Sequence, residues 1–193
     1  MPAHLPAHQP AAPPTDRPLP RLAAELERAE RLDPLAGLYD RISRAVVPAP
    51  GRARDELRGR SVGHPVHGVL TDLPIGLWAS AVALDLTRPH GHADAARRLV
   101  GLGLLAAPPT ALTGLADYRA LSVPARRVAA VHATCNGVGT LLAFASWRAR
   151  RAGRTGLGTL LSLAGMGAVG AGGYLGGHVA QAMREPRHVP GAR

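Results

Sequence analysis

The sequence contains no lysine, a single cysteine and few aromatic residues. These scarcities limit the classes of protein and the kinds of site to which the chain can belong. Cys135 alone excludes an intramolecular disulfide and any metal site built from several thiolates. Aromatic residues make up 3% of the 193 residues and hydrophobic residues 46%, so Ala, Leu, Val and Gly supply most of the apolar surface. Large rings usually fill a water-soluble core, whereas packed membrane helices favour small residues. The composition therefore favours a membrane protein.

The charge of the chain comes from arginine, because all 23 basic residues are arginine and the formal net charge is +10. These arginines lie in the N-terminal third and in short pieces between apolar runs, where membrane proteins keep their basic residues. No basic stripe is interleaved with aromatic residues, so we expect no binding to nucleic acid.

Four apolar runs predict membrane helices, since a helix needs about 20 apolar residues to cross the bilayer. Three runs are long enough, whereas the second is slightly short and contains Pro108-Pro109, which should kink it. The predicted fold class is all-α: an integral membrane four-helix up-down bundle over residues 63–183, with the lipid bilayer as its partner. The runs are 66–86, 99–116, 128–147 and 155–183.

The segments outside the bundle have a different composition. Residues 1–18 and 184–193 are predicted to be disordered, and the first of these lacks the apolar stretch of a secretory signal. In residues 19–47, leucines recur at helical spacing among charged residues, which predicts one or two amphipathic helices, broken near Asp33-Pro34. These would lie on the membrane surface or against the bundle. Residues 48–62 read as a charged linker.

Polar residues are expected to gather at one face of the membrane, which we call side A. In an up-down bundle, odd helices begin and even helices end on this face, and the opposite face is side B. Within the apolar runs, the one charge near side B is Asp85, close in sequence to Arg88. All four predicted helices bring polar groups to side A, namely His64, His67, Thr110, Thr113, Asp117, His132 and His178.

The histidines suggest a cofactor, because ionisable groups within membrane helices are costly and usually functional. Imidazoles on facing helices can hold a b-type haem, and neutral imidazole also binds other metals. We predict His67, His132 and His178 as haem ligands, with His64 as a fourth ligand candidate for a metal ion. Supporting hydrogen bonds or proton transfer are predicted for Asp72, Asn136, Asp117 and Tyr174.

Three functions remain open at this point. The favoured one is a b-type-cytochrome-like electron-transfer subunit that works with a separate iron–sulfur or quinone redox partner. The second is a haem-free metal-binding or transport protein, and the third is a structural or assembly module without a cofactor. None of them requires independent catalytic activity. Gly173 and Gly177 stand at the spacing of tightly packed membrane helices, which fits packing within the bundle. A homo-oligomer also stays open.

Ordered motifs resemble a known family. The run from Gly63 to Trp78 (GHPVHGVLTDLPIGLW) is similar to the opening motif of the bacterial membrane family known as domain of unknown function 2231. The likeness continues through TGLAD at 113–117, VHA at 131–133 and GGYLGGH at 172–178. It implies a four-helix membrane domain without an assigned activity.

Some members of this family continue into a Rieske iron–sulfur domain, which implies a link to electron transfer. With one cysteine, this chain cannot supply the Rieske ligand set, so its redox partner would be a separate protein. The resemblance places the chain in a bacterial cytoplasmic membrane. We expect both termini in the cytoplasm. The N-terminal segment has roughly sixty residues and is rich in charge, so moving it across the membrane without a signal is unfavourable.

Overall fold

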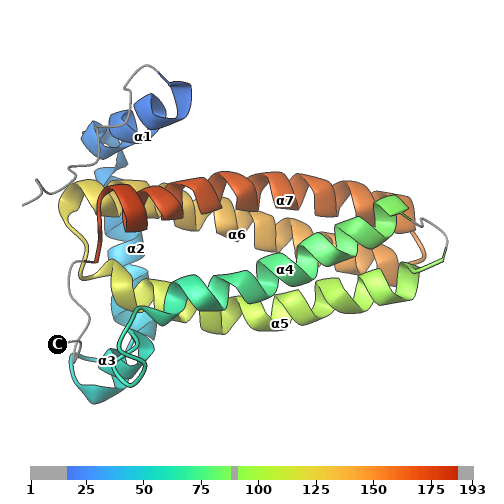
Figure 1. The fold of residues 1–193 in the computed structure, drawn as a ribbon, viewed down its shortest axis with the longest axis horizontal. Helices are drawn as coiled ribbons and strands as arrows, with labels where there is room; N and C mark the ends of the chain where they lie inside the picture. Colours follow the sequence, from blue (N-terminus) through green and yellow to red (C-terminus); the bar gives the residue numbers. More distant parts are fainter. Residues whose placement is uncertain (1–16, 88–90, 187–193) are drawn as a thin grey trace, which may run out of the picture.

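Four long helices form the body of the protein in a computed structural model that describes residues 17–87 and 91–186. They run side by side in alternating directions (Figure 1), and each is long and apolar enough to cross a membrane. The predicted all-α membrane bundle is confirmed. The predicted tails lie mostly outside the described residues. The helices are α4 (Val66–Thr87), α5 (Ala93–Tyr118), α6 (Val123–Arg151) and α7 (Thr155–Gly177), which a π-helical turn (His178–Ala182) extends.

Helix α5 is longer than its apolar run predicts, because it starts in the charged turn before Leu99 and continues to Tyr118. The helix continues without interruption through Pro108 and Pro109. With 26 residues it has a full membrane-spanning length.

Pro74 leaves a backbone carbonyl of α4 without its usual hydrogen-bond donor, and α5 supplies a donor in its place. A proline has no N–H, so the carbonyl of Leu70 lacks its usual partner four residues along the helix. The hydroxyl of Thr110 shares its proton between this carbonyl, 3.1 Å away across the helix interface, and the Ala106 carbonyl of its own helix at 2.9 Å. The hydrogen bond that is missing within α4 is thereby replaced by one between α4 and α5. Lipid could not replace it, because lipid tails offer no donor.

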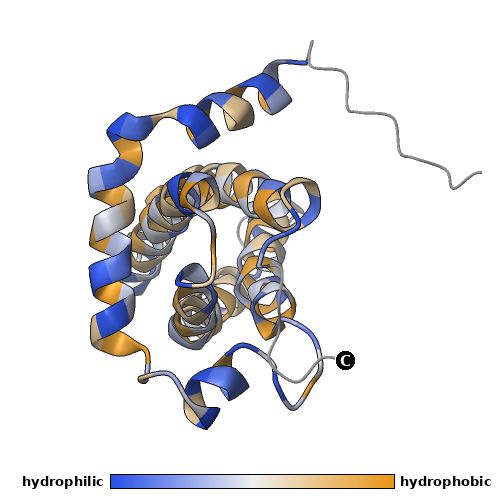
Figure 2. Cartoon of the chain, turned by 90° about the vertical axis from the view of Figure 1, so that its left-hand side faces the viewer, coloured by the Kyte–Doolittle hydropathy of each residue, from blue (hydrophilic) through white to orange (hydrophobic). Residues whose placement is uncertain are grey.

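Residues 18–57 form a belt around the side-A end of the bundle, which lies at the left of Figure 1. Viewed from that end, the belt passes along three sides of the four helices (Figure 2). The predicted break is found immediately before Asp33, where a short 3-10 turn (Glu30–Leu32) joins two helices. The predicted linker is not fully irregular, because it contains a third helix. The belt helices are α1 (Pro18–Arg28), α2 (Asp33–Val46) and α3 (Arg52–Leu57).

Polar contacts attach the belt to α5 and α6. Arg127 of α6 donates two hydrogen bonds to the carboxylate of Asp33, at 2.6 and 3.0 Å. These bonds hold the pKa of Asp33 below its usual range. The hydroxyl of Tyr118 donates to the carbonyl of Ala36 at 3.0 Å, and the hydroxyl of Ser43 donates to a carbonyl near the end of α5 at 2.8 Å.

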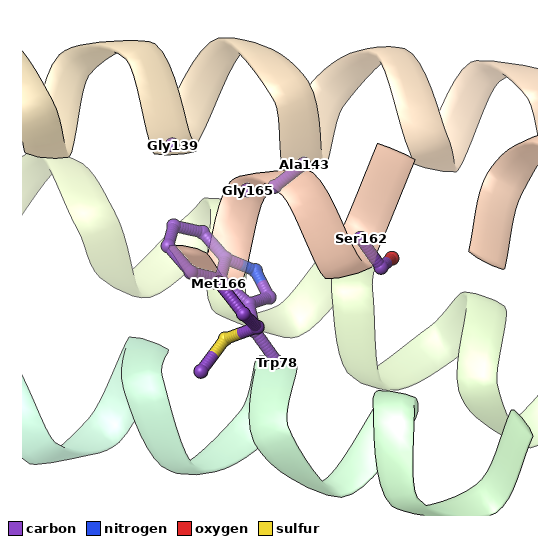
Figure 3. Close-up of a pocket in the computed structure, with 6 residues that line it drawn as sticks. All are labelled: Trp78, Gly139, Ala143, Ser162, Gly165 and Met166. Carbon is purple, nitrogen blue, oxygen red and sulfur yellow. The ribbon is translucent and has the colours of Figure 1, made fainter. Parts of the chain in front are cut away.

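Small residues bring the helices of the bundle close together. The carbonyl of Gly139 on α6 lies against Gly165 on α7, and the Val169 side chain fills the space above Gly139. Beside this contact, Trp78 of α4 reaches into the bundle (Figure 3) and donates its indole N–H to the carbonyl of Val100 at 3.2 Å. The cavity at this point has about 10 Å³, close to the space of one water molecule.

The close approach at Gly139 gives a testable prediction. A Cβ atom at this position would lie 2.4 Å from Cγ2 of Val169 and 3.1 Å from the carbonyl oxygen of Gly165. We expect Gly139→Ala to lower the stability by about 1–3 kcal/mol, as overpacking does elsewhere. Thermal unfolding of the purified protein in mild detergent measures this loss.

Gly137 on the same helix provides the matched control, because a Cβ atom there would meet no other atom within 4 Å. Gly137→Ala should leave the unfolding temperature unchanged or raise it, since alanine favours helix by about 1 kcal/mol over glycine. Equal unfolding temperatures for the two variants would contradict the packing argument.

Candidate functional site: a histidine pair inside the bundle

His67 lies in the first turn of α4 and points toward α5. Its Nδ1 atom is 3.0 Å from the carbonyl oxygen of Thr110 and 3.4 Å from the hydroxyl oxygen of Thr113. A carbonyl can only accept a hydrogen bond, so Nδ1 carries the proton and donates it. In this tautomer the other ring nitrogen, Nε2, keeps its lone pair for a ligand.

His132 on α6 is held in the same way by α7. Its Nδ1 atom donates to the carbonyl oxygen of Gly172 at 2.7 Å, which leaves Nε2 as the acceptor. The side-chain amide of Asn136, one turn further along α6, lies 3.1 Å from this Nε2 atom and donates to it. The predicted pairing of these two residues on one helical face is therefore present.

The two imidazoles face each other inside the bundle. Their ring centres are 6.2 Å apart, and the ring planes are almost perpendicular, at 86°. Each ring also lies against a glycine: a Cβ atom on Gly114 or on Gly176 would come within 2.7 Å of Cε1 of His67 or of His132, respectively. Glycine at these two positions gives the rings the room that they occupy, so all four helices shape the site.

The other two predicted ligands have different partners. Nε2 of His178, at the start of the π-helical turn, lies 2.7 Å from a carboxylate oxygen of Glu27 in α1. His64 lies in the exposed turn before α4, with Nδ1 3.3 Å from the carbonyl oxygen of Pro65. The four histidines therefore do not converge on one point. Across the part of the chain that the structure describes, no three His, Cys, Asp or Glu residues come together in a group suited to a metal ion.

The remaining predicted site residues Asp117, Asp72 and Tyr174 also lie apart from the histidine pair. Asp117 pairs at 3.3 Å with Arg58, which directly follows the belt, and both side chains are buried. Asp72 is exposed on α4, and Tyr174 packs against the apolar cluster around Leu175. Backbone carbonyls of α5 and α7, rather than the predicted Asp72, accept the Nδ1 protons of the histidine pair.

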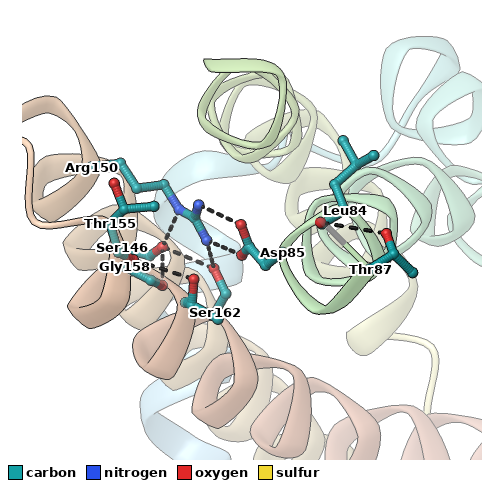
Figure 4. Close-up of polar contacts among 9 residues, drawn as sticks. Leu84, Asp85, Thr87, Ser146, Arg150, Thr155, Gly158 and Ser162 are labelled. Carbon is teal, nitrogen blue, oxygen red and sulfur yellow. Dashed lines mark hydrogen bonds and ion pairs between the residues drawn. The ribbon is translucent and has the colours of Figure 1, made fainter. Parts of the chain in front are cut away.

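A second polar site lies at side B, and the sequence analysis missed it. The guanidinium of Arg150 binds both carboxylate oxygens of Asp85, one of them at 2.9 Å, and the two side chains are 1% and 4% exposed (Figure 4). The Nε atom of Arg150 donates to the hydroxyl of Ser146 at 3.1 Å, and this hydroxyl lies 2.8 Å from that of Ser162. The charged pair and its two serine partners thus span three helices, α4, α6 and α7.

Asp85 stands close in sequence to Arg88, which lies outside the described residues, and its carboxylate pairs with Arg150 in the described structure. A signal for this pairing existed. Ser146 and Arg150 stand four residues apart, so they share one face of α6, and Asp85 is the one carboxylate near side B within an apolar run. A buried guanidinium requires such a partner.

Removing one member of this pair should be costly, because it leaves an uncompensated buried charge. We expect Arg150→Met to lower the stability by about 3–5 kcal/mol, measured by thermal or denaturant unfolding in detergent. Arg148→Met, at an exposed position of the same helix, serves as the control and should have little effect. The double variant Asp85→Leu with Arg150→Met should recover much of the loss, and an additive loss would refute the coupling.

Comparison with known proteins supports the membrane fold. A family model described as predicted membrane protein (DUF2231) matches residues 63–184, which include all four long helices and the histidine pair. No curated protein and no solved structure matches the chain. The family match covers more than half of the chain and begins three residues before α4. The chain is therefore a member of the DUF2231 family of predicted membrane proteins.

Proposed function

We propose that His67 and His132 bind a b-type haem and that the protein is an electron-transfer subunit of the membrane. The observation that carries this proposal is the shared hydrogen bonding of the two imidazoles: each Nδ1 atom lies within hydrogen-bonding distance of a backbone carbonyl oxygen. Such bonds to the second nitrogen fix the tautomer and the orientation of histidines that bind metals. Both rings then have Nε2 as the coordinating atom.

The spacing of the two rings fits a shared metal ion. An imidazole nitrogen binds a metal at about 2.0–2.1 Å, so two histidines that hold one ion must have their rings close together. The observed distance between the ring centres of His67 and His132 is 6.2 Å. On binding, the metal would replace the hydrogen bond that Asn136 donates to His132.

The arrangement of the four helices also fits a cofactor site between α4 and α6. Helix α4 packs against α5 and α7, and α6 packs against the same two helices, so α4 and α6 face each other across the interior of the bundle. Bundles of four helices commonly build cofactor sites from side chains on facing helices. When bound, haem supplies one-electron chemistry, which the protein tunes through the axial ligands and the surrounding polarity.

The residues of the chain would hold this group and control its surroundings. Thr110 and Gly172 would fix the two ligands through their carbonyls, and Gly114 and Gly176 give the two rings the room that they occupy. The site lies toward side A, which favours electron exchange with a separate iron–sulfur protein or a quinone at that face. We place side A and both termini on the cytoplasmic side of a bacterial membrane.

A structural role is the second candidate, and one observation favours it. His67 joins α4 to α5, and His132 joins α6 to α7, through hydrogen bonds that are complete without any cofactor. In this case the polar cluster stabilises the bundle and specifies its packing. A haem-free metal site would use the same two nitrogens, with its remaining ligands from outside the two histidines.

Absorption spectroscopy separates the candidates. The protein is expressed with haem available, purified in mild detergent, and measured before and after reduction with dithionite. We expect a Soret band and sharp visible bands on reduction, both lost in His67→Ala and in His132→Ala. The control variants His64→Ala and His178→Ala should keep the spectrum, because these histidines have other partners.

A featureless spectrum from folded wild-type protein would overturn the haem proposal. Elemental analysis of the same sample then distinguishes the remaining roles. Stoichiometric metal that is lost in His67→Ala and His132→Ala would indicate a haem-free metal site. Metal-free protein in which these substitutions lower only the unfolding temperature would indicate a structural role.

A further inference from the structure

Large apolar side chains remain exposed on the belt, although its helices pack against the bundle. Five such residues are between 36% and 54% exposed. Leaving them in water would be unfavourable, at about 25 cal/mol for each Å² of apolar surface. They require a partner outside the described contacts of the chain. The residues are Leu19, Leu22, Leu38, Ile42 and Val46.

The surface of helix α2 has three sectors, one buried, one apolar and one charged. Ala36, Ser43 and Val47 are buried on the sector that faces the bundle. On one flank of this sector Leu38, Ile42 and Val46 follow one another at intervals of four residues, so they form a continuous apolar flank. The opposite flank carries charged residues, which are Asp33, Asp40 and Arg44.

Contacts of Tyr39 give the direction of the apolar flank. Tyr39 stands on the same side of α2 as Ile42 and Val46, and its hydroxyl lies 3.1 Å from the hydroxyl of Thr134. Thr134 is 11 residues beyond Val123, the first residue of α6, which corresponds to about 16 Å along the helix axis. The apolar flank of α2 therefore faces the middle of the membrane.

The charged flank faces the opposite way. Asp40 lies in the field of Arg119 and Arg126, which belong to the turn between α5 and α6 and to the first turn of α6 at side A. A cavity of about 210 Å³, lined by Asp33, Asp40 and Arg126 among others, opens on this flank. The two flanks of one helix are thus separated along the direction of the membrane normal.

We propose that the belt is an interfacial element whose apolar flank packs against the lipid acyl chains of the side-A leaflet. The spans also expose large apolar side chains: Leu141 of α6, the helix that Tyr39 contacts, is 69% exposed. Helix α2 lies across the axis of the bundle (Figure 1), which is the orientation of an amphipathic helix in the plane of a membrane. The charged flank remains in the headgroup layer and in water. This inference is independent of any cofactor.

Spin labels at single cysteines test the proposal in the full-length protein. In a Cys135→Ser background, Ile42→Cys and Val46→Cys place labels on the apolar flank, and Arg44→Cys places one on the charged flank. The labelled proteins are reconstituted into phosphatidylcholine vesicles. Collision rates with oxygen, which dissolves in lipid, and with a nickel chelate, which dissolves in water, are then measured by electron paramagnetic resonance.

We expect the ratio of oxygen to nickel collisions at positions 42 and 46 to exceed that at position 44 severalfold. Leu141→Cys provides the lipid-facing reference, and Arg52→Cys, whose wild-type side chain is 87% exposed in the belt, provides the aqueous reference. All five positions are exposed at the surface, so the variants should fold, and their elution and unfolding profiles verify this.

Two results would overturn the proposal. A ratio at positions 42 and 46 equal to the aqueous reference would mean that the flank is in water. Strong dipolar broadening with low collision rates for both reagents would mean that a second copy of the chain covers the flank. Neither result bears on the haem spectrum, so this proposal and the proposed function fail separately.

Discussion

The absence of water from the bilayer core constrains most of the features described above. A polar group that loses a partner inside the membrane cannot find one in the solvent, so every such group needs a partner within the protein. Pro74 deprives the Leu70 carbonyl of its usual donor, and Thr110 replaces it from the next helix. Asp85 and Arg150 meet the same requirement with full charges. The polar groups of the spans therefore connect helices to one another as well as being satisfied.

Close approach of the backbones makes these connections feasible. The carbonyls of Thr110 and Gly172 come within hydrogen-bonding distance of the histidine rings because glycines at 114 and 176 leave room beside those rings. The scarcity of aromatic residues has the same origin, since bulky rings would separate the helices. Trp78 is accommodated because its indole packs against Gly103, where a Cβ atom would come within 2.2 Å of Nε1.

The sequence predicted the four spans, the amphipathic belt helices and the pairing of His132 with Asn136, because each depends on local composition or helical periodicity. Contacts between distant segments were harder to foresee. His178 was grouped with His67 and His132 from depth alone, but its partner is Glu27, 151 residues away, and that contact exists only because the belt folds back onto the bundle. Asp85 could be recognised as needing a partner, whereas the choice of Arg150 depends on how α4 and α6 are rotated about their axes.

The attachment of the belt also has a consequence for the order in which the protein assembles. Glu27 and Asp33 leave the ribosome before any of the spans, but their partners His178 and Arg127 lie on the last and the third of the four long helices. The belt therefore cannot complete these contacts until α7 has entered the membrane.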